Sequence, residues 1–199
     1  GFEKRLVIKR ILPHLASDPA FVARFVSEGK LVVQLRHAGV AQVLDLGEAD
    51  GVPFLVMEHV DGHDLRVLLQ LARASGHPTP TPVTVALLVR ILDVLDHAHQ
   101  ATDAAGEPLG IIHRDVSPSN VMVATTGEVK LLDFGIARAA SRLAHSASGA
   151  LQGKVAYMSP EQAAGDALDA RSDQSAVGVI AWELFAGERP FQGASDLKV

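Results

Sequence analysis

The stretch HRDVSPSN, residues 113–120, places an aspartate, Asp115, and an asparagine, Asn120, in one short loop. The pattern His-Arg-Asp, four residues and Asn should arise by chance in about one chain in a thousand of this length. A carboxylate at 115 can accept the proton of an attacking hydroxyl. An amide oxygen at 120 is a hard ligand of the kind that Mg²⁺ takes. The stretch therefore indicates general-base chemistry beside a hard cation.

Three further polar residues extend this pattern. Asp133 follows the segment VMVATTGEVKLL, which predicts a β-hairpin with its turn at residues 126–127, and offers a second oxygen ligand. Lys9 lies in a strand-like run and Glu28 in a helical one, so the two could pair and hold the ammonium near phosphate oxygens. Taken alone, each feature is also compatible with a role outside catalysis. Lys9 and Glu28 could form a surface ion pair, and Asp-Phe-Gly could form a turn.

Composition excludes several classes of function. The chain has 199 residues, a net charge of −5, 48% hydrophobic residues and no cysteine. A nucleic-acid partner or an anionic membrane needs a basic footprint, which this sequence lacks. No apolar run is long enough for a bilayer span. Absent cysteine suits a reducing compartment, so we expect a cytoplasmic domain whose parent protein could be anchored to a membrane elsewhere.

The order of predicted elements indicates an α+β fold. Strands are predicted at 5–11, 40–46 and 52–58, and a helix opens at Asp18-Pro19. Residues 72–82 are rich in Pro, Gly and Ser and predict a loop. We expect helices at 81–99 and 172–187 to be buried on most sides, with Trp182 in the core. A small sheet-rich lobe should thus join a larger helical lobe near residues 58–63.

In this order the motifs resemble those of the protein-kinase family, specifically the bacterial eukaryotic-like serine/threonine kinases. The stretches that carry the resemblance are LVIK, FVSE, FLVMEHVDG, HRDVSPSN, DFG and YMSPEQ. The resemblance implies the two-lobed kinase fold, with a partial N-lobe at 1–58, a hinge at 59–63 and a partial C-lobe at 64–199. The glycine-rich phosphate loop and the distal helices of the family have no counterpart, so we expect a fragment truncated at both ends.

The resemblance also assigns roles to individual residues. Lys9 would contact the α- and β-phosphates of ATP with Glu28 as its helix partner, and Asp115 would be the catalytic base. Asn120 and Asp133 would hold Mg²⁺. The remaining nucleotide contacts would be Val7 above the adenine, Met122 below it, Met57 as gatekeeper, the backbones of Glu58 and Val60, and Asp64 at the ribose. Asp173 would hold the catalytic-loop backbone, and His113 would pack beneath Phe134.

Two departures from the family pattern concern charge. Ser117 stands where family members carry a lysine that approaches the transferring phosphate, and Lys154 stands where they carry a threonine that contacts the catalytic loop. We hypothesise that Lys154 supplies the charge that Ser117 lacks, the alternative being a lysine that faces solvent. Arg114 could receive a phosphorylated serine of the activation segment, with Ser141, Ser146 and Ser148 as candidates for autophosphorylation.

Three functions remain open on the sequence alone. The first is a protein serine/threonine kinase that uses ATP and Mg²⁺ on a protein hydroxyl. The second is a pseudokinase that serves as a binding or scaffold module, which Ser117 favours and the intact acids oppose. The third is a kinase-like small-molecule phosphotransferase, but such enzymes lack a full activation segment, and the stretch from Asp133 to Glu161 favours a protein substrate.

Overall fold

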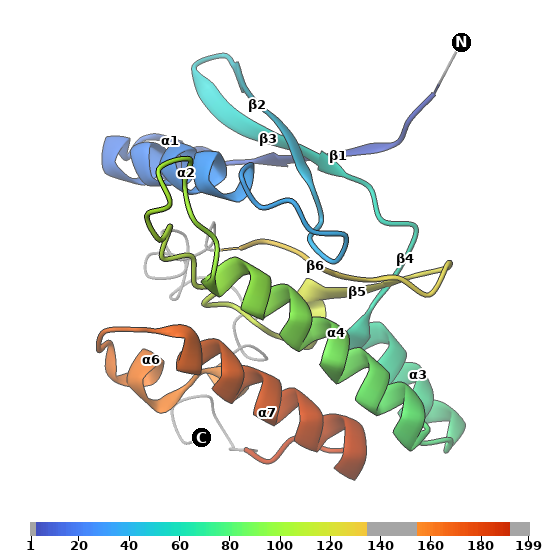
Figure 1. Cartoon of the computed structure of the whole chain (residues 1–199). Coiled ribbons are helices and arrows are strands. Elements are labelled where there is room, and N and C mark those ends of the chain that lie inside the picture. Colours follow the sequence, from blue (N-terminus) through green and yellow to red (C-terminus); the bar gives the residue numbers. More distant parts are fainter. Residues whose placement is uncertain (1–2, 135–154, 192–199) are drawn as a thin grey trace.

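The computed structural model describes residues 3–134 and 155–191, and these form two lobes with the chain crossing between them after β3 (Figure 1). The smaller lobe contains an antiparallel sheet in the order β1-β3-β2. Its strands and helices are β1 (Leu6–Arg10), α1 (Pro13–Ala16), α2 (Pro19–Val32), β2 (Val43–Ala49) and β3 (Val52–Glu58). Helix α2 packs against β2 and β3.

The larger lobe is mostly helical and carries a second antiparallel sheet in the order β4-β5-β6. Its elements are β4 (Gly62–Asp64), α3 (Leu65–Ser75), α4 (Thr81–His99), η1 (Pro118–Asn120), β5 (Val121–Ala124), β6 (Val129–Leu131), η3 (Val155–Tyr157), α6 (Pro160–Ala164) and α7 (Ala170–Ala186). Helices α4 and α7 pack along one another beneath this sheet (Figure 1). The α+β, two-lobed fold predicted from the sequence is confirmed.

Local sequence explains where these elements begin and turn. The carboxylate of Asp18 accepts hydrogen bonds from the Ala20 and Phe21 N–H groups, which caps α2 as expected. Asp50 and Gly51 both have positive φ, 53° and 74°, and this conformation closes the β2–β3 hairpin. Strand β3 has the predicted bounds.

Strand β2 starts three residues later than the sequence predicted, because the preceding loop pairs elsewhere. The Ala41 N–H donates to the Leu131 carbonyl at 2.9 Å, and the Leu131 N–H donates to the Gly39 carbonyl at 2.7 Å. Residues before β2 are thereby joined to β6 of the other lobe.

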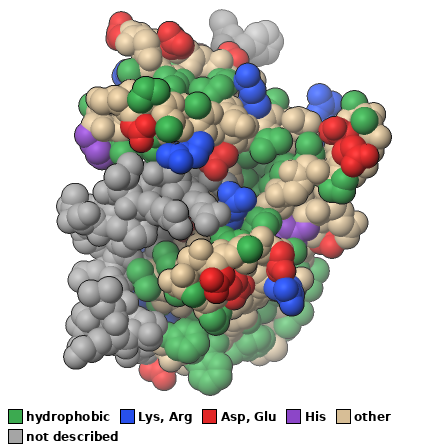
Figure 2. All heavy atoms as spheres, turned by 90° about the vertical axis from the view of Figure 1, so that its left-hand side faces the viewer, with side chains coloured by type: hydrophobic (Ala, Val, Ile, Leu, Met, Phe, Trp, Pro, Cys, Tyr) green, Lys and Arg blue, Asp and Glu red, His purple; other side chains and the backbone are tan. Residues whose placement is uncertain are grey.

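Three sequence-based expectations were wrong in detail. Helices α3 and α6 were missed, and α3 runs into the predicted 72–82 loop until Gly76 ends it with φ 70°. Helices α4 and α7 were expected to be buried on most sides, yet each has an apolar exposed face. Trp182, placed in the core, is 55% exposed. Figure 2 shows hydrophobic side chains at the surface of the helical lobe. The physical reason is that α4 and α7 cover only one face of each other.

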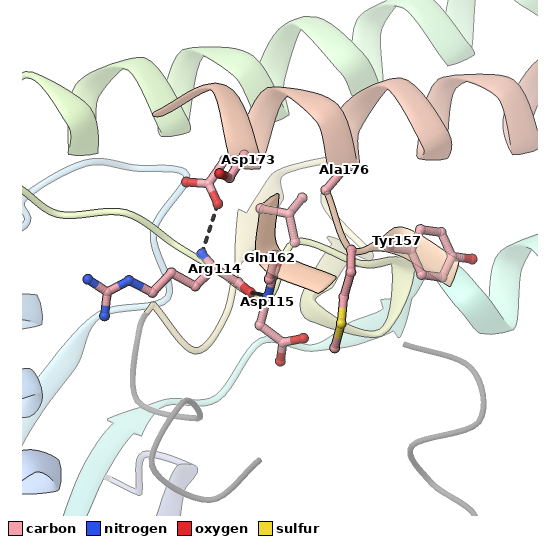
Figure 3. A pocket seen from close by; sticks show the side chains of 9 residues that line it. Arg114, Asp115, Tyr157, Gln162, Asp173 and Ala176 are labelled. Atoms are coloured by element: carbon pink, nitrogen blue, oxygen red, sulfur yellow. Dashed lines mark hydrogen bonds between the residues drawn. The ribbon is translucent and has the colours of Figure 1, made fainter. Parts of the chain in front are cut away.

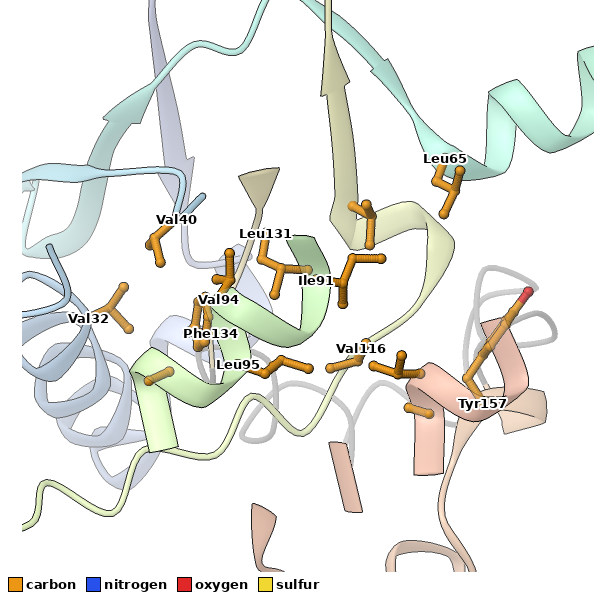
Figure 4. Close-up of a cluster of buried hydrophobic side chains, with 14 of the residues drawn as sticks. Val32, Val40, Leu65, Ile91, Val94, Leu95, Val116, Leu131, Phe134 and Tyr157 are labelled. Atoms are coloured by element: carbon orange, nitrogen blue, oxygen red, sulfur yellow. The ribbon is translucent and has the colours of Figure 1, made fainter. Parts of the chain in front are cut away.

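The core joins the two lobes at the catalytic loop (Figure 4). Leu131 of β6, Ile91 of α4 and Val40 of the loop before β2 are all buried. Phe134, directly after the Asp133 position, is also buried, so the segment that carries this acid is fixed by packing. No helix among residues 3–134 and 155–191 is long and apolar enough to cross a bilayer. The lobe boundaries at 58–64 stay a prediction.

Candidate active site

A cleft of about 500 Å³ separates the small sheet from the β4-β5-β6 sheet. Its walls come from β1, from β3 and the residues that follow it, and from β5 and the segment after β6. The lining residues are Val7, Ile8, Lys9, Met57, Glu58, His59, Val60, Gly62, Met122, Leu132 and Asp133. All the nucleotide contacts predicted from the sequence lie here except Asp64. The Asp64 carboxylate instead accepts the Val67 N–H at 2.9 Å and caps α3.

Two opposite charges meet in this cleft. The Lys9 ammonium lies 2.8 Å from the Asp133 carboxylate, and both side chains are about one-third exposed. Lys9 points inward from β1, where it is paired with Leu55 of β3. Asp133 adopts φ 61°, a left-handed conformation that costs a non-glycine residue about 1 kcal/mol or more. Burial of Phe134 next to it maintains this strained backbone.

Asp115 and Asn120 are held together as a unit. The Asn120 side-chain amide donates to the Asp115 carbonyl at 2.7 Å and to the Asp115 carboxylate at 2.9 Å. Asn120 is buried, and its own carbonyl accepts the Leu132 N–H at 2.9 Å, directly before Asp133. The three residues that the sequence placed at a magnesium and proton-transfer site therefore belong to one connected segment of structure.

Asp173 of α7 fixes the backbone of the 113–120 loop (Figure 3). Its carboxylate accepts the His113 and Arg114 N–H groups, each at 2.8 Å, and a third bond joins it to His99 Nε2 at 2.8 Å. Burial raises the pKa of this carboxyl, but the His99 hydrogen bond and the hydrogen bonds from the two backbone N–H groups lower that pKa by more, so the net shift is downward. The predicted anchoring role is confirmed.

His113 is a structural residue, as expected. Its ring is fully buried and lies 4.5 Å from the Phe134 ring, centroid to centroid. Nδ1 accepts the Asp115 N–H at 3.3 Å and Nε2 donates to the Leu132 carbonyl at 2.8 Å, which together require the neutral ring. Burial lowers the pKa of His113, in keeping with that state.

Glu28 of α2 lies beside Arg114 of the 113–120 loop. Among the described residues, Lys9 pairs with Asp133, while Glu28 Oε1 lies 4.0 Å from Arg114 Nη1. The Arg114 backbone is left-handed, with φ 66°, and its Nε is buried without an acceptor among the described residues. In Figure 3 its guanidinium and the Asp115 carboxylate leave the loop in different directions. The role of Glu28 as partner of Lys9 stays a prediction.

Sequence reasoning missed a second set of anchors after the activation segment. Gln162 Nε2 donates to the Arg114 carbonyl at 2.7 Å, so α6 also fixes the catalytic loop. The Glu161 carboxylate accepts the Ser172 hydroxyl at 2.6 Å, and this bond lowers the pKa of Glu161. The run YMSPEQ contains both residues, but no local pattern predicts which backbone carbonyl a glutamine will reach.

A buried carboxylate links three helical elements near the same segment. Glu183 of α7 accepts the Tyr157 hydroxyl and lies 2.7 Å from the Arg73 guanidinium of α3. Burial, followed by the bond to Glu183, raises the pKa of Tyr157 well above its ordinary value. This network holds the end of the activation segment against α7.

Four residues from the sequence analysis concern the activation segment and lie outside the described residues. They are Lys154, Ser141, Ser146 and Ser148. Ser117, the residue in place of the family lysine, is described: it is buried and its hydroxyl lies 3.0 Å from that of Ser119.

Comparison with known proteins accounts for this arrangement. A family model described as protein kinase domain matches residues 3–199. The chain belongs to the protein kinase domain family. The cleft and the 113–120 loop both lie within the residues that the family model matches.

Two bacterial kinases show the similarity in sequence. The chain is 44% identical over 199 residues to the tyrosine-protein kinase MasK of Myxococcus xanthus, covering all of this chain and 31% of that protein. It is 39% identical over 200 residues to the serine/threonine-protein kinase PknB of Mycobacterium tuberculosis, covering 98% and 30%. The chain thus spans about a third of the curated relatives it matches.

A solved kinase domain has the same fold. The crystal structure of the Mycobacterium tuberculosis PknI kinase domain superimposes with a TM-score of 0.71 at 32% identity, covering 94% of this chain and 66% of that one. At that identity and coverage, the likeness supports the same two-lobed kinase fold that the elements above describe.

Proposed function

We propose that this chain is the catalytic part of a protein serine/threonine kinase that transfers the γ-phosphoryl group of ATP to a protein hydroxyl. The observation that carries the proposal is the convergence of Lys9 and Asp133, 2.8 Å apart in one cleft, beside the hydrogen-bonded Asp115–Asn120 unit. The Lys9 ammonium and the Asp133 carboxylate thus line a space of the size a nucleotide needs, and the Asn120 carbonyl is bonded to the Leu132 N–H directly before Asp133.

The chain's residues divide the work of this reaction. Lys9 would contact phosphate oxygens, and Val7 and Met122 would enclose the adenine from opposite sides. The Asp115 carboxylate would accept the proton of the substrate hydroxyl as its oxygen bonds to the γ-phosphorus and the bond to ADP breaks. Asp173, Gln162 and His113 keep the loop in place, so the base needs no rearrangement during the step.

The donor set also fits Mg²⁺. Asp133 presents a carboxylate to the cleft, and Asn120 donates through its amide nitrogen to Asp115, which leaves the amide oxygen as the ligand atom. Among residues 3–134 and 155–191, no group of three or more His, Cys, Asp or Glu could hold a metal ion by itself. Mg²⁺ is commonly held by one or two protein groups together with substrate phosphates, so this pair suffices. The bound ion would neutralise charge on the phosphates.

A relative named as a tyrosine kinase makes the acceptor hydroxyl the part of the proposal most in need of a test. The full-length protein would be incubated with γ-labelled ATP and Mg²⁺, with myelin basic protein in one reaction and an aminoglycoside in another. We expect labelled protein that yields phosphoserine or phosphothreonine on acid hydrolysis. Phosphotyrosine alone would contradict the serine/threonine assignment. Label on the aminoglycoside would contradict the assignment of a protein substrate. An absence of transfer to either acceptor would favour a pseudokinase.

Arg114 supports a role for phosphorylation in this kinase. Its Nε is buried without an acceptor among the described residues, and a buried unsatisfied donor of this kind costs about 1–3 kcal/mol. A phosphoserine offers acceptor oxygens for such a guanidinium. Autophosphorylation at Ser141, Ser146 or Ser148 therefore stays our prediction, and an unmodified 133–161 segment in an active preparation would refute it.

A further inference from the structure

An ion pair joins the two lobes behind the cleft. The Lys130 ammonium of β6 lies 2.8 Å from Oε1 of Glu58 and 3.1 Å from Oε2, so it bridges both carboxylate oxygens. The side chains of Lys130 and Glu58 are only 12% and 26% exposed. Glu58 is the last residue of β3, where the chain leaves the small lobe, whereas Lys130 belongs to the sheet of the large lobe. The pair therefore ties the start of the connection between the lobes to the large lobe.

A short loop completes this junction. Two hydrogen bonds join Gln42 to Glu58. The Glu58 N–H donates to the Gln42 carbonyl at 2.9 Å, and the Gln42 N–H donates to Glu58 Oε2 at 3.2 Å. The same loop is bonded to β6 through Ala41 and Leu131. Glu58 is thus held on its backbone and on its side chain, and Lys130 is the cation that balances its charge.

The junction has consequences for the cleft although Lys130 does not line it. Glu58 lines the cleft, but Lys130 and Glu58 together line a separate hollow of about 590 Å³ behind it. Lys130 lies opposite Met122 in the β5–β6 ladder, so both side chains leave the same face of that sheet. Leu132 and Asp133, the next wall residues, follow β6 directly.

We propose that Lys130 is a positioning residue for the nucleotide, acting through Glu58. By fixing Glu58 it sets the spacing between the connecting segment at 58–60 and the wall formed by Met122 and Asp133. That spacing sets the position of the connecting segment relative to Met122, which would contact the adenine, and to Asp133, which would lie near the phosphates. This inference rests on the proposed function, because it assumes that ATP is the ligand of the cleft.

The contacts of Glu58 distinguish a role of Lys130 in nucleotide positioning from a role in folding stability alone. An ordinary surface ion pair between two flexible side chains adds little. Here the Glu58 carboxylate also accepts a backbone N–H, and Glu58 itself lines the cleft, so loss of the lysine releases a group beside the nucleotide. The effect should therefore appear in nucleotide affinity before it appears in the chemical step.

Steady-state kinetics of the full-length kinase test the proposal. We expect Lys130→Met and Glu58→Gln each to raise the KM for ATP by about fivefold, with kcat within about twofold of the unsubstituted protein. Lys130→Arg, which can bridge both oxygens, should restore a KM within about twofold. Lys30→Met removes a lysine from the exposed surface of α2 and should leave both constants unchanged.

The outcomes separate this inference from the proposed function. If Lys130→Met leaves the KM for ATP unchanged, or if Lys130→Arg is as impaired as Lys130→Met, the positioning role is wrong. If the unsubstituted protein neither binds nor uses ATP, the proposed function fails instead. Thermal unfolding of each variant is recorded in parallel. If Lys130→Met fails to fold, the KM of Glu58→Gln for ATP decides between these outcomes, because this substitution keeps the size of the side chain.

Discussion

The Lys9 ammonium of β1 contacts the Asp133 carboxylate across the cleft at 2.8 Å, joining the small lobe to the segment after β6. The contact is between residues 124 positions apart in the sequence, from 133 − 9. It holds both charges inside the cleft, beside the left-handed backbone of Asp133. The pairing defines where nucleotide phosphates would lie.

Loss of the ammonium should therefore impair catalysis strongly. We expect Lys9→Met to lower kcat/KM for ATP by about a hundredfold or more, because the cation would stabilise phosphate charge in a partly desolvated site. Phosphotransfer with γ-labelled ATP measures this. Lys4→Met, in the exposed segment before β1, is the matched control. Equal activity of the Lys9 and Lys4 variants would contradict the assigned role.

Asp173 should be required for both stability and activity. In Asp173→Asn the amide nitrogen would face backbone N–H groups that now donate to the carboxylate. We expect a loss of about 2–3 kcal/mol in unfolding free energy, together with lower kcat, since bonds to a charged acceptor are lost. Thermal and denaturant unfolding of the full-length protein would measure it. The control is Asp169→Asn, an exposed N-cap that asparagine can replace.

Buried His113 predicts a pH dependence of stability. Its pKa is lowered from 6.5 by burial, so the unfolded chain binds the proton more readily than the folded one. The contribution of the neutral ring is complete above pH 6.5 and declines as the pH falls toward the folded-state pKa. His113→Phe should remove this decline. The stability difference between the native protein and the variant, measured by denaturant unfolding from about pH 7.5 to about pH 5, should shrink. A constant difference would refute the assignment.

The sequence was sufficient for features whose spacing is local. The cap at Asp18 and the hairpin turn at residues 126–127 depend on neighbours within a few residues, and both lie where expected. Contacts that depend on folding together distant segments were not predictable. Gln162 to the Arg114 carbonyl, Tyr157 to Glu183 and Lys130 to Glu58 have no signature in the sequence.

Exposure was the least predictable property. Helices α4 and α7 are apolar on several faces, and composition alone does not say which face another element covers. Trp182 is exposed for this reason, although an isolated aromatic in an apolar helix is usually buried.

The Ser117 substitution leads to a separate prediction about Lys154. Ser117 is buried, and its hydroxyl is hydrogen-bonded to that of Ser119. Because both side chains are uncharged, neither supplies a cation to the loop. If Lys154 supplies it, Lys154→Ala should lower kcat by between about ten- and a thousandfold, since a unit charge near the phosphoryl group is worth several kcal/mol. The double variant Lys154→Thr with Ser117→Lys should recover activity. Full turnover by Lys154→Ala would end the hypothesis.

The catalytic base gives the most direct test of the account. Transfer of label from γ-labelled ATP to a protein acceptor is measured for the full-length protein and for Asp115→Asn, with Mg²⁺–ATP affinity determined alongside. We predict a loss of about a thousandfold in kcat with affinity changed little, because the carboxylate acts on the hydroxyl and not on the nucleotide. Undiminished transfer by Asp115→Asn, or an absence of transfer in the unsubstituted protein, would contradict the claim that this cleft is a phosphotransferase site.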